Sequence, residues 1–357
     1  MRNSIKITAI AFALTVIGCN TKTETITATD VVETPEVVEL AAITAPKSIE
    51  QKRSVVFIAG YDKGGNTYYK DAKAYFESQN KEVVETAYSL QEIILWLNIN
   101  HNNNPYSEIH IVNKSKLNEM SIETTVKGEK VTSETLKNVL ADGSLPKLKN
   151  VLTKDAKLIF HASGIGNDID LMDTFKEAFK TDIEPSIVST SLVSVFGGKF
   201  TPHYLAKPYY GYYPTANSPG RIDLAKEFSK KYDDSDIDWF SVLDNESEKY
   251  QGDIYTYKFN VPVKWEFDYE NEEEIPSFRT LEEMYDWMKE NQEIAKDLEQ
   301  MNIPIQKFRW FETVKGNKLI IKGKSTVVVV LEPVMSPAYP QEYMTPTIDN
   351  LRLFDTL

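Results

Sequence analysis

The first half of the chain alternates short apolar runs with segments of helical periodicity. Apolar runs of roughly four to eight residues bounded by turn formers are typical of buried strands, and they occur at 55–59, 82–87, 108–112, 156–161 and 187–190. Between them, apolar residues recur three or four positions apart, which predicts helices. These helical segments are 69–76, 90–97, 132–140, 145–152 and 171–179. Strands alternating with helices predict an α/β fold with a mostly parallel sheet flanked by helices.

Beyond about residue 220 this alternation ends, and the pattern predicts an α+β C-terminal extension over 221–357. The elements expected there are a strand, a helix and the two strands of a hairpin, at 255–267, 281–301, 307–314 and 317–331. Pro262 is expected to break the first strand, and Gly316 lies at the turn of the hairpin. The run 326–331 is so apolar that it has to be buried or paired.

The N-terminal segment has the layout of a signal peptide. Arg2 and Lys6 precede an almost unbroken apolar stretch at 7–17, whose 11 residues are too few to span a bilayer. Residues 20–52 contain no aromatic residue and are rich in Thr, Glu, Val and Ala, which is typical of an extended tether. The predicted organisation is therefore a signal peptide (1–18), a tether (19–52), an α/β domain (53–220) and the extension (221–357).

The apolar stretch ends in Val16-Ile17-Gly18-Cys19, which resembles the lipobox of bacterial lipoproteins, where a small residue precedes an obligatory cysteine. The resemblance implies that the chain is cut before Cys19 and that the Cys19 thiol is acylated. The acyl chains would then hold the protein in the lipid bilayer of the bacterial cell envelope, since two or more chains give stable anchoring. Asn20, in place of an aspartate, implies the outer membrane. The alternative is an ordinary secretory signal peptide with a cysteine there by chance.

Composition narrows the possible partners and cofactors. The chain has 357 residues and one cysteine, which excludes a disulfide framework and any multi-cysteine metal site. Its four histidines form no close pair in the sequence, so we predict neither a metal ion nor another cofactor. The net charge of −13 argues against nucleic acid as a partner, because phosphate binding needs dense Lys and Arg. Cleavage before Cys19 would remove two basic residues and no acidic one, which makes the mature chain more acidic still.

Two strand ends carry polar residues from which a site could be built. Functional groups of an open parallel sheet lie beyond the carboxyl ends of its strands, where this chain has Asn113-Lys114-Ser115 and the segment 161–166, His-Ala-Ser-Gly-Ile-Gly. The order of strands and loops over about 54–200 resembles the caspase-like fold of clan CD cysteine peptidases. In that family the third strand ends in His-Gly, and the fourth ends in a catalytic Cys before a glycine-containing turn. Here Lys114 and Ser115 stand where His and Gly are expected, and Ser163 stands where Cys is expected.

These departures imply that cysteine-peptidase activity is lost, because the lipid would consume Cys19. We predict a non-catalytic pseudo-enzyme that serves as a binding or interaction module of the cell envelope. The alternative is a serine-type hydrolase or peptidase in which Lys114 acts as the base for Ser163. A lysine can do so only where burial or a nearby cation depresses its pKa. The backbone N–H groups of residues 164–166 would then form the oxyanion hole.

A tyrosine-rich segment is a second candidate surface. Five of the 19 tyrosines fall within ten residues, at Tyr204, Tyr209, Tyr210, Tyr212 and Tyr213. Together with three prolines and His203 they predict a stiff loop near the strand ends, whose rigid aromatic side chains suit the binding of a protein, peptide or glycan. The alternative is that the loop docks onto its own sheet and the tyrosines cover the core. His110 and His161 are predicted to be core histidines with satisfied hydrogen bonds.

Overall fold

The computed structural model describes residues 53–65, 67–116, 119–244 and 251–357. The predicted signal peptide, Cys19 and the predicted tether up to residue 52 lie outside the described residues. No helix in the described ranges is long and apolar enough to cross a membrane.

The predicted parallel sheet is present as a six-stranded sheet with the order β13-β7-β6-β3-β1-β2. Its strands are β1 (Ser54–Ile58), β2 (Glu82–Val84), β3 (Tyr106–Val112), β6 (Leu152–His161), β7 (Ser186–Ser189) and β13 (Asp355–Thr356). All neighbouring pairs are parallel except β13 with β7. The prediction of an α/β fold with a mostly parallel sheet is confirmed, and each strand predicted for this half of the chain is found.

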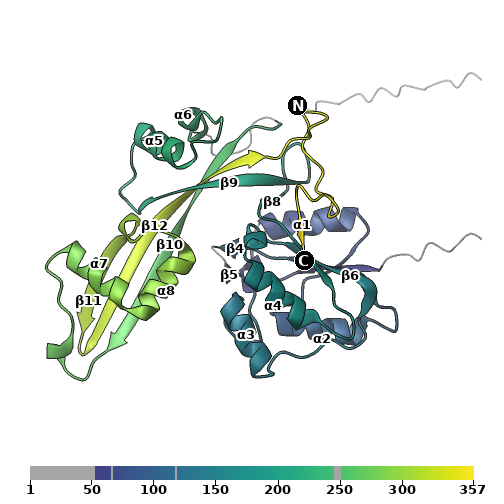
Figure 1. The fold of residues 1–357 in the computed structure, drawn as a ribbon, viewed down its shortest axis with the longest axis horizontal. Coiled ribbons are helices and arrows are strands. Elements are labelled where there is room, and N and C mark those ends of the chain that lie inside the picture. The colour runs from purple at the N-terminus through teal and green to yellow at the C-terminus, as the bar shows by residue number, and fades with distance from the viewer. Residues whose placement is uncertain (1–52, 66, 117–118, 245–250) are drawn as a thin grey trace, which may run out of the picture. The chain divides into compact units, whose positions relative to one another are not determined.

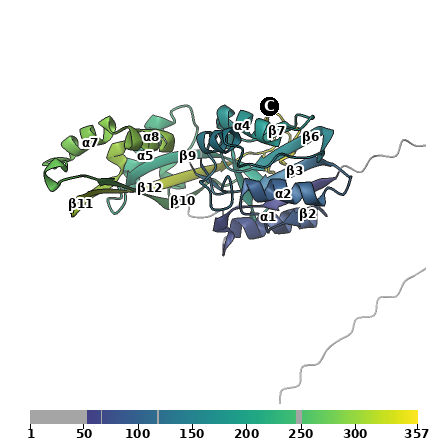
Figure 2. The ribbon, with the colours of Figure 1, turned by 90° about the horizontal axis from the view of Figure 1, so that it is seen from below.

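Helices cover both faces of this sheet. They are α1 (Thr67–Ser78), α2 (Leu90–Asn100), α3 (Ser133–Ala141) and α4 (Ile169–Phe179). The helices α2, α3 and α4 pack on the face that carries Phe57, whereas Phe76 of α1 packs with Val56 on the opposite face. Figure 1 shows α1 on one side of β6 and α2 on the other, and Figure 2 shows β3 between β6 and β2. Because successive strand residues point to opposite faces, the same short apolar run supplies both cores.

The helix predicted over 145–152 is wrong. Residues 145–150 form neither helix nor strand, and Leu152 begins β6. Leu145 and Leu148 are buried in the core shared by α2, α3 and α4, so their spacing reflects burial of an irregular segment. Short elements nearby are β4 (Ser115–Lys116), β5 (Glu119–Met120), and the 3-10 turns η1 (Tyr61–Lys63) and η2 (Ile165–Asn167).

The second half forms an antiparallel sheet around one long central strand. Its strands are β8 (Val193–Phe196), β9 (His203–Pro214), β10 (Tyr255–Asp268), β11 (Arg309–Lys315) and β12 (Lys318–Pro333). The order is β10-β12-β9-β8, and β11 pairs with the first part of β12. Residues 327–331 of β12 are at most 1% exposed, which confirms that this apolar run is buried.

Local predictions for this half are partly confirmed. The hairpin at Gly316 is present, with Gly316 at a φ of 55° in the left-handed region that its turn requires. The prediction that Pro262 breaks this strand is wrong. The strand β10 lies at the edge of the sheet and pairs only with β12, and a proline is tolerated in an edge strand because one side of it has no neighbouring strand to bond. The helical segment 281–301 is divided at Asn291. The helices of this half are α5 (Arg221–Lys231), α6 (Trp239–Val242), α7 (Leu281–Glu290) and α8 (Gln292–Met301), with 3-10 turns η3 (Glu272–Glu274) and η4 (Ile305–Lys307).

The tyrosine-rich segment is the strand β9, and its prediction as a loop is wrong. Tyr204 and Tyr212 are buried in the core under α7 and α8, and Tyr209 and Tyr213 are buried on the other face with α5 and α6. Tyr210 is partly buried. The prolines that suggested a loop are tolerated because residues 207–214 of β9 pair with β12 alone. The segment therefore corresponds to the alternative in which tyrosines cover the core.

The two sheets do not divide the chain at the predicted boundary of residue 220. The strand β9 precedes this boundary and belongs to the second sheet, and the last strand, β13, returns to the first sheet. Leu353 and Phe354, just before β13, pack with Val188 of β7 and Leu205 of β9. Residues 51–357 accordingly form one compact unit.

Candidate functional site at the strand ends

The carboxyl ends of β3 and β6 bring the predicted pair of residues onto adjacent loops. Val112 is paired with His161, so Lys114 and Ser163 each follow a neighbouring strand by two residues. Both side chains are half-buried, as is Ser115. The Ser115 hydroxyl donates a hydrogen bond to the carbonyl oxygen of Ser163, which ties the two loops together. The sequence correctly placed these residues at one edge of the sheet.

Two tyrosines of α1 hold this edge in place. The Tyr69 hydroxyl donates to Asp62 Oδ1 at 2.7 Å and accepts from the backbone N–H of Lys114 at 3.0 Å. The Tyr68 hydroxyl donates to the carbonyl oxygen of His161 at 2.9 Å. Burial, and then the hydrogen bond to Asp62, raises the pKa of Tyr69 well above its usual value. The Tyr69 hydroxyl therefore stays protonated and acts as a structural donor.

Asn113 joins three segments from a fully buried position. Its Nδ2 donates to the carbonyl oxygen of Ala59 at 2.6 Å, and its Oδ1 accepts from the backbone N–H of Ile122 at 3.3 Å. Gly60, next to Ala59, has a φ of 116°, and a Cβ at this position would lie 2.8 Å from Asn113 Nδ2. The ends of β1 and β3 and the segment after β5 are thus fixed by one side chain.

Lys114 is placed against an aromatic ring. Its Nζ lies 5.6 Å from the ring centroid of Tyr68, within the range of a cation–π interaction. This attraction favours the charged ammonium, whereas a general base has to be neutral.

The predicted oxyanion hole is largely occupied by the protein itself. The backbone N–H of Gly164 donates to the carbonyl oxygen of Leu192 at 3.2 Å, and that of Gly166 donates to the carbonyl oxygen of Thr190 at 3.1 Å. A Cβ at Gly166 would lie 2.6 Å from the carbonyl carbon of Thr190, so the two loops are in close contact. Two of the three N–H groups expected to stabilise an oxyanion therefore already have acceptors.

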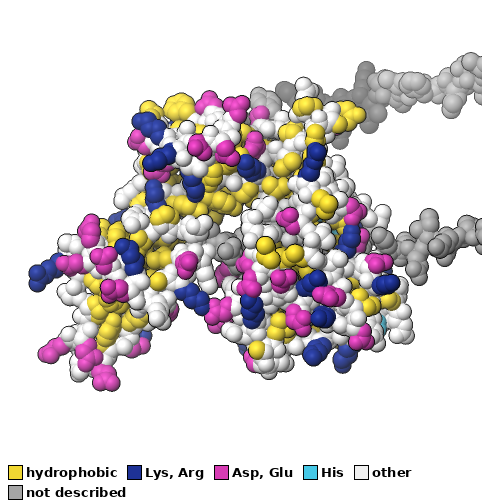
Figure 3. Space-filling model, in the orientation of Figure 1, with side chains coloured by type: hydrophobic (Ala, Val, Ile, Leu, Met, Phe, Trp, Pro, Cys, Tyr) yellow, Lys and Arg dark blue, Asp and Glu magenta, His cyan; other side chains and the backbone are white. Residues whose placement is uncertain are grey.

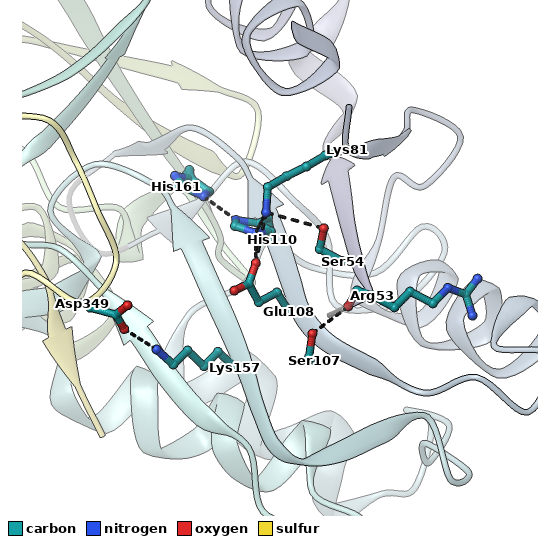
Figure 4. Close-up of polar contacts among 9 residues, drawn as sticks. All are labelled: Arg53, Ser54, Lys81, Ser107, Glu108, His110, Lys157, His161 and Asp349. Atoms are coloured by element: carbon teal, nitrogen blue, oxygen red, sulfur yellow. Dashed lines mark hydrogen bonds and ion pairs between the residues drawn. The ribbon is translucent and has the colours of Figure 1, made fainter. Parts of the chain in front are cut away.

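A buried histidine cluster lies on the α1 side of the first sheet, and sequence reasoning missed it. His110 Nδ1 and His161 Nε2 are 3.0 Å apart, and Lys81 Nζ lies 3.0 Å from both His110 Nε2 and Glu108 Oε2 (Figure 4). The His203 ring, from β9, has its centroid 5.9 Å from that of His161. The sequence indicates only that His110 and His161 lie on two predicted strands. That the two side chains share one face of the sheet follows from the register between β3 and β6, which the structure supplies.

The cluster consists of neutral imidazoles. Burial is the largest cause that lowers the pKa of His110 and of His161, and it lowers the pKa of His203 to about 3. His203 Nε2 lies 3.1 Å from the Ser194 hydroxyl, whereas the Nδ1 atoms of His161 and His203 are buried without a partner among the described residues. His110 and His161 are core residues as predicted, but the prediction that the hydrogen bonds of His161 are satisfied is wrong. The hydrogen bond to His110, and then Lys81, lowers the pKa of Glu108 to about 2. Within the same described ranges, no group of three or more His, Cys, Asp or Glu side chains is arranged to hold a metal ion.

Comparison with known proteins identifies no family for this chain. Neither the protein-family models nor the curated protein sequences contain a match to this chain.

Proposed function

We propose that the protein is a non-catalytic, lipid-anchored binding protein of the bacterial cell envelope, built on a caspase-like domain that has lost its catalytic dyad. One observation carries the loss of catalysis. Beside Ser163, the N–H groups of Gly164 and Gly166 are engaged by the neighbouring loop, so an oxyanion at this edge would find few donors. The strand order β7-β6-β3-β1-β2, with helices on both faces, supports the caspase-like relationship.

Lipid anchoring is proposed from the lipobox-like residues 16–19, with Asn20 favouring the outer membrane. We expect cells that express the full chain to incorporate labelled palmitate into it, and we expect Cys19→Ala to abolish incorporation because the acylated thiol is gone. Thr21→Ala, which leaves the cysteine in place, is the matched control. Incorporation that persists unchanged in Cys19→Ala would refute the anchor.

The second candidate function is a serine-type hydrolase, favoured by the adjacency of Lys114 and Ser163 at the ends of paired strands. We expect a fluorophosphonate probe to leave the full chain unlabelled, because two of the three backbone N–H groups beside Ser163 that could stabilise an oxyanion are already engaged. In-gel fluorescence measures this, with a known serine hydrolase as the positive control. Labelling that is lost in Ser163→Ala but kept in Ser115→Ala would establish the hydrolase and overturn the non-catalytic proposal.

A further inference from the structure

A pocket of about 500 Å³ lies along the part of β9 that has no neighbouring strand on its outer side. Its volume falls in the range of sites for small organic molecules, roughly 300–1,000 Å³. The aromatic part of the wall comes from Tyr210 and Tyr212 of β9 and Phe228 of α5. Lys230 and Lys231 of α5 and Lys307 of η4 also line the pocket.

The charged side chains that line this pocket are mostly basic, whereas the chain as a whole is acidic. Lys230, Lys231 and Lys307 are accompanied among the lining residues by one acidic side chain, Glu227, whose Oε1 and Oε2 each lie 3.1 Å from Lys307 Nζ. The pocket therefore carries an excess of positive charge, although the net charge of the chain is −13. Figure 3 shows Lys and Arg side chains beside a band of hydrophobic surface in the region of α5 and β9.

Lys231 is held at the aromatic wall. Its Nζ donates to the carbonyl oxygen of Tyr210 at 2.9 Å and lies 4.8 Å from the ring centroid of Tyr212. Burial, and then the positive charge of Lys307, lowers the pKa of Lys231. An ammonium in this position is partly desolvated and repelled by a second cation, and a bound anion would relieve both effects.

We propose that this pocket binds a small organic acid with a flat apolar body, whose carboxylate meets the lysines while its body packs against Tyr210 and the accessible edge of Tyr212. Charge-assisted hydrogen bonds to the carboxylate supply specificity, and burial against the rings supplies affinity. The excess of positive charge attracts an anionic group, and the aromatic wall favours one that is attached to a flat apolar body. The inference rests on the proposed binding role and names the class of ligand.

The test uses 2-naphthoate as the probe and its uncharged isostere 2-naphthamide as the comparison, titrated into the full-length chain carrying Cys19→Ala. Isothermal titration calorimetry should give a Kd below about 1 mM for 2-naphthoate and a value about tenfold or more higher for 2-naphthamide. The double variant Lys230→Met/Lys307→Met should weaken 2-naphthoate by about tenfold or more while leaving 2-naphthamide unchanged.

The matched control is Lys226→Met, on the same helix but outside the lining of the pocket, where its Nζ lies 4.0 Å from Asp223. It should bind 2-naphthoate as the parent chain does. Equal affinities for 2-naphthoate and 2-naphthamide, an equal loss in Lys226→Met, or no binding at millimolar probe would each overturn the inference. A chain that incorporates palmitate and escapes the fluorophosphonate probe, yet does not bind 2-naphthoate, would refute this pocket and leave the proposed function standing.

Discussion

Replacement of Asn113 by alanine is expected to lower the free energy of unfolding by roughly 2–5 kcal/mol. The substitution removes both hydrogen bonds of a fully buried side chain and leaves the carbonyl oxygen of Ala59 and the N–H of Ile122 without a partner. Each buried backbone group left unpaired costs about 1–3 kcal/mol. Urea unfolding followed by circular dichroism measures the change.

Asn98 supplies the control for this variant. Its side chain also bonds one carbonyl oxygen and one N–H, those of Lys147 and Lys149, at 2.9 Å each, but at an exposed position. Because water can take over both bonds, Asn98→Ala should lower the unfolding free energy by about 1 kcal/mol or less. Equal losses in the two variants would show that Asn113 does not hold the strand ends as described.

Acidification from pH 7.5 to pH 5 is expected to destabilise the fold through the buried histidine cluster. The pKa of each of His110, His161 and His203 is lowered in the folded state, so below about pH 6.5 the unfolded chain binds more protons than the folded one. Stability therefore falls as the pH falls, by about 1.4 kcal/mol per pH unit for each histidine that stays neutral in the fold. Glu108 acts in a lower window, since its stabilising charge is lost as the pH falls from about 4.5 toward its lowered pKa of about 2.

A double variant isolates one member of the cluster. Ser194→Ala/His203→Phe removes both partners of a buried hydrogen bond and keeps an aromatic ring beside Phe196, whose centroid is 4.2 Å from that of His203. The slope of unfolding free energy against pH, measured between pH 5 and 6.5, should decrease by about 1.4 kcal/mol per pH unit. Ser194→Ala alone, which keeps His203 in its buried place, should retain the parent slope. A double variant with the parent slope would contradict the titration of His203.

Most of the first sheet was predictable because it is built from local pattern. Residues 55–58 of β1 and 109–112 of β3 are buried between the two helical layers, and a strand of that kind is almost wholly apolar; His110 is the one polar residue among these eight. The positions of Lys114 and Ser163 followed from the same pattern, since the ends of parallel strands share one edge. The segment 145–152 shows where such reasoning fails. The spacing of its apolar residues correctly predicted that they are buried, but it wrongly predicted a helix.

The sequence by itself determined the parallel strands of the first sheet, most of the helices, the single cysteine and the absence of a Cys–His dyad at the strand ends. Only the tertiary structure decided which backbone N–H groups next to Ser163 are already engaged, and that β9 is a strand whose tyrosines are buried. It also decided that His203 joins His110 and His161, and that Lys307 comes to the pocket beside α5. The reason is physical: periodicity records whether a side chain is buried, whereas its partner depends on pairings between distant segments, such as β9 with β12, that no local pattern encodes.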